Sequence, residues 1–228
     1  EKEKESDQTE ISFNVTYDSY IVNENFIITA SPDTATVPVV TRTDNNLSFT
    51  AVTGVIYTLK NEEGYTSLGD ITVEYVSDAW KISSESNTCA NEGTLDIKFG
   101  VTLGNKEIHV GLEDADGPIT AAFTLNNPSS TVSLTNGIGS FILLPVSTAK
   151  YKYTAGNYTL SNSTYGDIEI KIDGNGNITE VAQGSNKFSL YSGLYTGLAK
   201  DKSTVYIGET ALTLSSTPTE TANKINVA

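Results

Sequence analysis

Hydrophobic and polar residues alternate along most of this chain, and the alternation is clearest between residues 167 and 181. Three isoleucines alternate there with three charged residues, in the run Ile168-Glu169-Ile170-Lys171-Ile172-Asp173. A period of two places the isoleucines on one face of a strand and the charges on the other. The following Gly174-Asn175-Gly176 supplies the positive φ angles of a tight turn. The pattern predicts a β-hairpin with one buried face, and a bulge because Ile178 and Val181 of the return leg fall on opposite faces.

Short strands separated by turns explain the rest of the pattern. Residues 11–17 alternate most cleanly, whereas the continuous apolar run at 26–30 indicates a more buried strand. Further strands are expected at residues 37–41, 47–52, 55–59, 71–76, 94–99, 106–112, 119–125, 131–134, 140–146, 151–160, 205–207 and 211–214. Residues 188–198 have a helix-like spacing, but Gly193 and Gly197 favour a strand–turn–strand. The whole is typical of an all-β protein built from β-sandwiches.

Chain length and turn chemistry indicate two domains. The 228 residues are enough for two β domains of ordinary size. An acidic run from Glu113 to Asp116 ends in Gly117 and Pro118, which suits a joint between domains. We therefore expect an N-terminal tail and strand at residues 1–22, an Ig-like β-sandwich at 23–117 and a second one at 118–228.

The charge of the chain narrows the classes of partner. Asp and Glu number 28 against 14 Lys and Arg, which gives a net charge of −14. Binding to duplex nucleic acid needs a basic surface that this chain lacks, and anionic membranes are disfavoured for the same reason. No run of about 18 apolar residues occurs, so we expect no membrane span. The single cysteine, Cys89, excludes an internal disulfide and a cysteine-based zinc site.

Sequons for N-glycosylation suggest that the protein is secreted. Five sites fit the Asn-x-Ser/Thr pattern: Asn14, Asn46, Asn157, Asn162 and Asn177. A chain rich in Asn, Ser and Thr produces some such matches by chance. In three of them, Asn14, Asn157 and Asn177, the alternation places the acceptor on the face opposite the apolar residues, where a bulky glycan fits.

Catalytic motifs are missing from the sequence, and we expect no enzyme activity and no cofactor. His109 is the single histidine, so a Ser-His-Asp triad would have to use it, and no Gly-x-Ser-x-Gly turn supplies a serine. The alternation around His109 indicates a solvated surface position. Paired carboxylates of a glycosidase cannot be recognised from spacing, which leaves a glycoside-active enzyme as the third-ranked hypothesis.

Two acidic turns are weak candidates for calcium. Asp173 opens a segment with oxygen ligands at positions one, three and five of a calcium loop, but its sixth position is Ile178 instead of glycine. We favour a simple hairpin turn there. Asp114 and Asp116 lie in the acidic run near residue 117, for which a solvated linker is the preferred interpretation.

The predicted strand at residues 11–17 follows a charged segment, and this arrangement suggests that the strand could pair with another copy of the chain. Residues 1–10 are charged and poor in apolar side chains, and residues 11–17 then place Ile11, Phe13 and Val15 on one face. A strand joined flexibly to its domain can leave it and complete the open sheet of another copy. In this layout the whole chain resembles donor-strand pilins, in particular the archaeal thread-type pilus subunits. The residues that support the resemblance are Ile11, Phe13, Val15 and the five acceptor asparagines.

The resemblance implies a secreted, N-glycosylated cell-surface filament without disulfides. Its partner would be further copies of the same chain, joined head to tail, with Ile11, Phe13 and Val15 in the N-terminal donor strand. The resemblance also implies Lys–Asn isopeptide crosslinks, for which the sequence selects no pair. A second possible donor is the C-terminal Lys224-Ile225-Asn226-Val227. The alternative function is a secreted carbohydrate-binding or adhesive β-sandwich protein, for which the twelve tyrosines provide candidate stacking rings.

Overall fold

The structure is a computed structural model that describes residues 7–98, 103–114, 116–184, 186–191, 194–198 and 204–208. Side chains are described for residues 7–98, 103–112 and 116–184. All regular elements within these ranges are β-strands, which confirms the all-β class predicted from the sequence. None of the described residues forms a helix of the length and apolarity that a membrane crossing needs.

Two compact units make up the chain. Unit 1 comprises Glu1–Leu103 and Val146–Lys152, and unit 2 comprises Gly104–Pro145 and Tyr153–Ala228. The chain therefore passes between the units three times, and the second passage gives unit 1 a short segment from the middle of the sequence. The first junction is at Leu103, whereas the sequence placed a domain boundary near residue 117.

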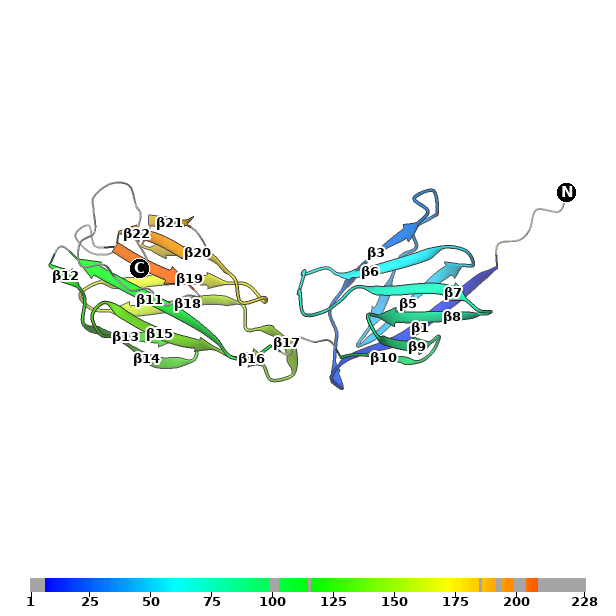
Figure 1. Ribbon diagram of the computed structural model, residues 1–228, viewed down its shortest axis with the longest axis horizontal. Helices are drawn as coiled ribbons and strands as arrows, with labels where there is room; N and C mark the ends of the chain where they lie inside the picture. Colours follow the sequence, from blue (N-terminus) through cyan, green and yellow to red (C-terminus); the bar gives the residue numbers. More distant parts are fainter. Residues whose placement is uncertain are drawn as a thin grey trace. The chain divides into compact units, whose positions relative to one another are not determined.

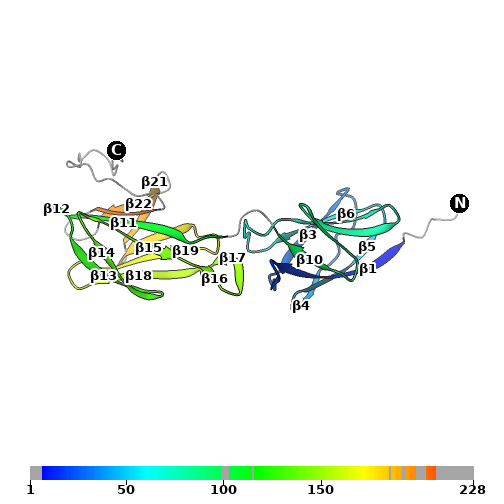
Figure 2. The ribbon, with the colours of Figure 1, turned by 60° about the horizontal axis from the view of Figure 1, so that its bottom comes forward.

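One sheet of unit 1 is organised around its first strand. Its hydrogen-bonded order is β10-β1-β5-β4, with β2 paired to the end of β1. The strands are β1 (Gln8–Tyr17), β2 (Tyr20–Ile21), β4 (Thr41–Thr43), β5 (Asn46–Val52) and β10 (Thr94–Ile97). Figure 2 shows β1 in the same layer as β5 and β10.

The second sheet of unit 1 is a plain antiparallel sheet in the order β3-β6-β7-β8-β9. It consists of β3 (Phe26–Ser31), β6 (Ile56–Asn61), β7 (Ile71–Val76), β8 (Ala79–Ser84) and β9 (Asn87–Ala90), and its central strands run side by side in Figure 1. Residues of both sheets form one buried cluster, for example Phe13 and Leu95 from the first sheet with Leu59 and Ile82 from the second. This packing is consistent with a β-sandwich.

A short hairpin completes the core of unit 1. It is formed by β16 (Pro145–Val146) and β17 (Ala149–Tyr153). Ala149 and Tyr151 belong to the same buried cluster as the two sheets, and Val146 packs against that cluster. We call the unit 1 part of this hairpin, Val146–Lys152, the finger.

Unit 2 is dominated by one long sheet in the order β12-β11-β23-β22-β21-β20-β19-β18-β13-β14, with β15 paired to β11. The strands are β11 (Lys106–Asp114), β12 (Gly117–Pro118), β13 (Ala121–Asn126), β14 (Ser129–Leu134), β15 (Ile138–Leu143), β18 (Gly156–Asn162), β19 (Gly166–Ile172), β20 (Ile178–Gln183), β21 (Asn186–Tyr191), β22 (Leu194–Leu198) and β23 (Thr204–Gly208). The antiparallel pairing of β21 with β22 confirms the strand–turn–strand predicted at residues 188–198.

The alternation of residues 167–173 is confirmed in unit 2. Ile168, Ile170 and Ile172 of β19 are buried, while Glu169 and Lys171 are exposed. The pairing of β19 with β20 shifts register between Lys171 and Ile172, so the predicted bulge is also present. A single strand with one apolar row therefore specifies which face of the sheet is buried.

Two strand predictions in unit 1 are wrong in detail. The apolar run at 26–30 was expected to be buried on both faces, but β3 is an edge strand and Ile27 is 54 % exposed. Residues 37–40 form no strand, and Val39 is 85 % exposed. Hydrophobicity alone does not distinguish an edge strand from a central one, because that difference depends on the partner strands.

Candidate functional site

The first strand occupies a groove between two other strands of unit 1. β1 pairs antiparallel with β5, with Gln8 opposite Val52 and Asn14 opposite Asn46. On its other edge β1 pairs parallel with β10, from Asn14 to Tyr17. Removal of β1 would therefore divide this sheet, with β10 on one side and β5 and β4 on the other. We call the space that β1 fills the β1 groove.

The inward face of β1 is apolar and fully buried. Ile11, Phe13, Val15 and Tyr17 all have 0 % exposed surface. Burying one such side chain is worth about 1.5–3 kcal/mol, so the four together contribute several kcal/mol before the ordering cost is counted. Ile11, Phe13 and Val15, which the sequence places on one face, do share a face, and Tyr17 extends that row.

Polar side chains on the outward face of β1 match partners on the neighbouring strands. Asn46 on β5 accepts a hydrogen bond from the Ser12 hydroxyl (3.2 Å) and donates one to the Asn14 Oδ1 atom (3.1 Å). The Thr16 hydroxyl donates to Asp96 on β10 (2.8 Å). The outward face is therefore held by specific side-chain pairs as well as by the backbone ladder.

Asn91 extends the parallel edge of the groove beyond β10. Its Oδ1 atom accepts from the Ser12 backbone N–H (2.8 Å), and its Nδ2 atom donates to the Glu10 carbonyl (3.0 Å). The Glu92 N–H then donates to the Ser12 carbonyl, and Gly93 accepts from the Asn14 N–H. One carboxamide thus acts as a backbone peptide would, in a region where β10 has not yet begun.

A two-residue turn joins β1 to β2 and is held in an unfavourable conformation. Asp18 and Ser19 have φ angles of 45° and 69°, although neither is glycine. The left-handed region costs a non-glycine residue about 1–2 kcal/mol. Asp96 offsets part of this cost because its carboxylate accepts from the Ser19 N–H at 2.9 Å. Burial raises the pKa of Asp96, but the hydrogen bonds from Ser19 and Thr16 and the charge of Lys98 lower it overall.

The finger covers the end of the β1 groove. The Tyr151 ring is fully buried, 5.8 Å from the Tyr17 ring in an edge-on arrangement and 5.8 Å from the Tyr65 ring. The Ser67 hydroxyl donates to the Tyr151 carbonyl. Lys150 of the finger lies 5.0 Å from the centre of the Tyr20 ring on β2. The finger therefore contacts both strands that flank the Asp18–Ser19 turn.

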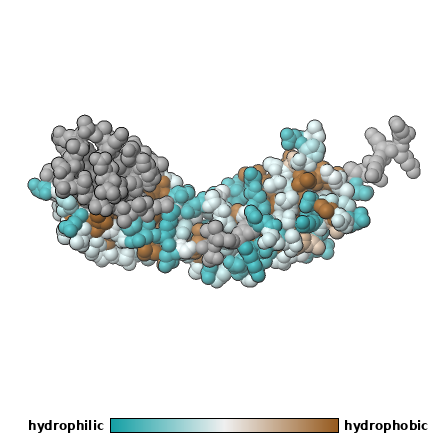
Figure 3. Space-filling model, viewed as in Figure 1, coloured by the Kyte–Doolittle hydropathy of each residue, from teal (hydrophilic) through white to brown (hydrophobic). Residues whose placement is uncertain are grey.

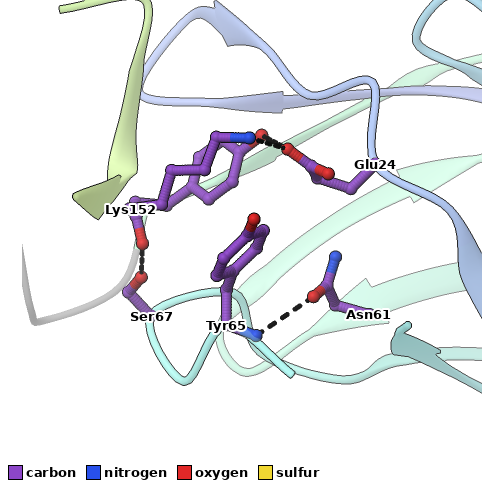
Figure 4. A network of polar contacts seen from close by, with 6 residues as sticks. Glu24, Asn61, Tyr65, Ser67 and Lys152 are labelled. Atoms are coloured by element: carbon purple, nitrogen blue, oxygen red, sulfur yellow. Dashed lines mark hydrogen bonds and ion pairs between the residues drawn. The ribbon is translucent and has the colours of Figure 1, made fainter. Parts of the chain in front are cut away.

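A partly buried ion pair joins the finger to the rest of unit 1 (Figure 4). Lys152 forms a salt bridge with Glu24, and these side chains are only 24 % and 13 % exposed. The Tyr151 hydroxyl also donates to Glu24, at 2.7 Å. Burial alone would lower the pKa of Lys152, but its hydrogen bond to Glu24 and the charge of that group raise the pKa overall. Burial, followed by the effect of Glu24, raises the pKa of Tyr151 strongly.

Asn61 lies beside this network, and its Nδ2 atom is buried with no hydrogen-bond partner. Its Oδ1 atom accepts from the Tyr65 N–H at 3.0 Å (Figure 4). Lys152 forms its salt bridge with Glu24. The Lys–Asn crosslinks that the resemblance implies therefore stay a prediction.

The five sequons differ in how their asparagine side chains are used. Asn157 and Asn177 are exposed, whereas Asn14, Asn46 and Asn162 are half-buried. The Asn162 Nδ2 atom, to which a glycan would be attached, donates to the Ala122 carbonyl at 2.9 Å. On these grounds Asn157 and Asn177 are the most accessible acceptors among the five.

The calcium and histidine candidates have structural roles in the described residues. The Asp173 carboxylate accepts from the N–H groups of Asn175 and Asn177, both at 2.9 Å, which is how an aspartate caps a hairpin turn. No group of three or more possible metal ligands lies together in the described part of the chain; Asp116 is exposed, and the side chain of Asp114 lies outside it. His109 lies 3.6 Å from Glu107 and is 15 % exposed, so it is more buried than the sequence suggested.

Several residues of this site are not marked by the sequence. Asn91 and Asp96 lie far along the chain from β1, Glu24 lies far from Lys152, and no spacing rule connects them. The alternation Ala149-Lys150-Tyr151-Lys152-Tyr153 predicts a strand, but nothing in it indicates packing against the core of unit 1. The second donor candidate, Lys224-Ile225-Asn226-Val227, lies outside the described residues. In comparisons with known proteins, no protein-family model matches the chain and no curated protein is significantly similar to it.

Proposed function

We propose that the chain is a structural subunit of an extracellular filament in which β1 of one copy fills the β1 groove of the next. The observation that carries the proposal is the position of β1. It is a central strand with four fully buried inward side chains, and the two-residue turn at Asp18 and Ser19 joins its end to the next strand, β2.

The exchange of β1 would conserve its inward packing and the contacts of its outward side chains with Asn46 and Asp96. Because the groove of a second copy is identical, the same apolar row and the same polar partners are available there. The net gain comes from the Asp18–Ser19 turn, which can extend and leave the left-handed region when β1 enters another copy. Short strained hinges favour such exchange.

Head-to-tail growth follows from the difference between donor and acceptor. The donated strand and the groove are distinct surfaces of each copy, so each added copy leaves one strand and one groove unused at the two ends. An interface of this kind extends into a filament unless a rotation closes it into a ring. The protein then acts mechanically and not as an enzyme, and the partner it recognises is itself.

A secreted location fits the same proposal. Asn157 and Asn177 present exposed acceptors and belong to unit 2, whereas the residues that line the β1 groove belong to unit 1. We expect glycans at these two positions in the native protein. The mass of the intact native chain should exceed 24.4 kDa by whole sugars, with the excess mapped to peptides that contain Asn157 or Asn177. A native mass equal to that of the chain would contradict this part of the proposal.

The adhesive alternative receives less support from the described surface. Stacking on sugars needs exposed aromatic rings, and Tyr75 at 39 % is the one aromatic residue among the exposed large hydrophobic side chains of the described residues. The face drawn in Figure 3 shows hydrophobic side chains in small separate patches among hydrophilic ones. We therefore prefer the filament subunit.

The direct test is competition by a free strand. A peptide of residues 8–17 should occupy open grooves at growing ends and shorten or abolish filaments seen by electron microscopy. A matched peptide with Phe13→Asp places a charge in the apolar row and should have no effect, because burying an unpaired charge is very costly. If purified protein forms no filaments under any condition, or if both peptides leave growth unchanged, the proposal fails.

A further inference from the structure

We propose that the polar contacts made by Asn46 and Asp96 set the register in which the β1 groove accepts a strand, and thereby select β1 over other apolar strands. These residues touch the outward side chains of β1. That the accepted strand comes from a second copy rests on the proposed function. The register itself is a property of the groove and can be measured in any assembly state.

The apolar row alone leaves the register open. Side chains alternate between the two faces, so a slip of two residues keeps every inward residue inward. After such a slip, Ile11, Phe13 and Val15 would occupy the positions of Phe13, Val15 and Tyr17. Three of the four inward positions would still be filled by hydrophobic side chains, and Thr9 would take the buried position of Ile11.

The outward row does not tolerate the same slip. Asn46 contacts both Ser12 and Asn14, and a shift of two residues replaces one member of this set with Glu10 or Thr16. Asp96 would lose the Thr16 hydroxyl, at 2.8 Å, for Asn14 or an extended Asp18. The outward contacts therefore distinguish registers in which most of the inward positions stay apolar.

Asn91 binds the backbone of the strand, which repeats every two residues, so it holds β1 in the groove without choosing between registers. Its carboxamide binds the Glu10 carbonyl and the Ser12 N–H together, at 3.0 and 2.8 Å. It is half-buried in the turn between β9 and β10, where the parallel ladder has not yet begun. Asn91 therefore extends the edge of the groove so that β1 is held on both sides from Glu10 onward.

An exchanged strand depends on these contacts more than a tethered one. In the closed chain, the turn at Asp18 and Ser19 also pins the register of β1, through the pairing of Tyr17 with Tyr20. A strand that arrives from another copy has no such short tether in its acceptor. Its register must then be set by contacts with the groove.

Another strand of the same chain, β19, could compete with β1 for the β1 groove. β19 has the same inward pattern, with Ile168, Ile170 and Ile172 in alternation. Its outward residues are Glu169 and Lys171, which carry charges where β1 has Ser12 and Asn14. Neither charge reproduces the paired hydroxyl and carboxamide that Asn46 binds, so the groove favours β1.

Disulfide trapping measures the register directly. In a Cys89→Ser background, Glu10→Cys is combined with Thr50→Cys, Ser48→Cys or Val52→Cys. Glu10 lies opposite Thr50, so the first pair reports the observed register, and the other two report slips of two residues in either direction. Directly opposite residues lie about 4.5–5.5 Å apart, within disulfide range, whereas diagonal ones lie about 7–8 Å apart. Every variant also carries two glycines inserted between Ser19 and Tyr20. They lengthen the turn, so that it no longer fixes the register of β1.

With Asn46 and Asp96 intact, we expect the Thr50 pair to form at least tenfold more disulfide than either slipped pair. In the folded N46A/D96A variant the slipped pairs should rise at least tenfold. Thr94→Ala is the matched control, an exposed polar residue on β10, and should change nothing. The single variants N46A and D96A keep the test informative if the double variant does not fold, and each should show a smaller rise. Ser48→Ala removes the Asn46 sequon without touching the Asn46 side chain and should behave as the parent.

Two results would overturn the inference. One is a folded N46A/D96A variant, or folded single variants, in which the slipped pairs remain absent. The other is a parent in which the slipped pairs already form as readily as the Thr50 pair. The size of the disulfide-bonded species on a denaturing gel tests only the proposed function. A band at the size of one chain indicates a closed strand, and a band at the size of two or more chains indicates an exchanged strand.

Discussion

The ring of Tyr17 at the end of β1 lies edge-on to the ring of Tyr151 in the finger, with centroids 5.8 Å apart and planes inclined by 63°. Both residues are fully buried in the core of unit 1, although they come from opposite sides of the junction at Leu103. The groove for the first strand is therefore completed by a hairpin that the chain adds much later. Unit 1 needs the finger both for its core and for the end of that groove.

Removal of the Tyr151 ring should destabilise unit 1 strongly. Tyr151→Ala is expected to lower the free energy of unfolding by about 3–5 kcal/mol, because a large buried side chain leaves a cavity. Tyr151→Phe keeps the ring and loses only the bond to Glu24, so about 1–2 kcal/mol should be lost. Tyr75→Ala removes an exposed ring and is the control, with an expected loss of about 1 kcal/mol. Denaturant unfolding measures all three, and equal losses for Tyr151→Ala and Tyr75→Ala would show that the finger is not part of the core.

The Glu24–Lys152 pair should behave as a coupled unit. Lys152→Met or Glu24→Gln alone leaves a partly buried group without its partner, at an expected cost of about 2–4 kcal/mol. The double variant should cost at least about 1 kcal/mol less than the sum of the single ones. A double-mutant cycle in urea gives this coupling. Strict additivity would mean that the contact in Figure 4 contributes nothing to stability.

Relief of the strained turn should favour the closed chain. Ser19→Gly accepts the φ angle of 69° without a Cβ penalty, so we expect the closed form to gain about 0.5–1 kcal/mol and filaments to form more slowly. Ser48→Gly is the matched control because Ser48 lies in the extended strand β5, where glycine destabilises. Unfolding curves and light scattering follow the two effects. Faster assembly of the Ser19→Gly variant would contradict a role for turn strain.

Acid should loosen the same turn through Asp96. The pKa of Asp96 is lowered in the folded protein, so its contribution to stability is present above the ordinary aspartate pKa and is lost as the pH falls through the folded value. Asp96→Asn should therefore reduce stability at pH 7 and make little difference once the pH has fallen below the folded pKa of Asp96, where the native carboxyl is protonated too. Thermal unfolding of both proteins across this range tests the expectation, and parallel curves at all pH values would refute it.

Local patterns in the sequence predict the strands of the sheets, but they do not predict the residues that form the candidate site. The isoleucines of β19 are predictable because a period of two is a local property, and the same holds for Ile11, Phe13 and Val15. The edge position of β3 and the docking of the finger were not predictable, because they depend on which distant strands become neighbours. The same limit applies to Asn91 and Asp96, whose roles exist only once β1 lies beside β10.

The central claim is that β1 of one copy enters the groove of another, and mixed disulfides test it most directly. Two proteins are prepared in a Cys89→Ser background, one with Glu10→Cys alone and one with Thr50→Cys alone, at positions that face each other across β1 and β5. Neither protein can form a disulfide within its own chain. After assembly of the mixture and mild oxidation, the exchange of strands predicts a band that joins one chain of each kind. Assembly without that mixed band would contradict the account. The account would also fail if a protein that carries both Glu10→Cys and Thr50→Cys formed the disulfide only within single chains.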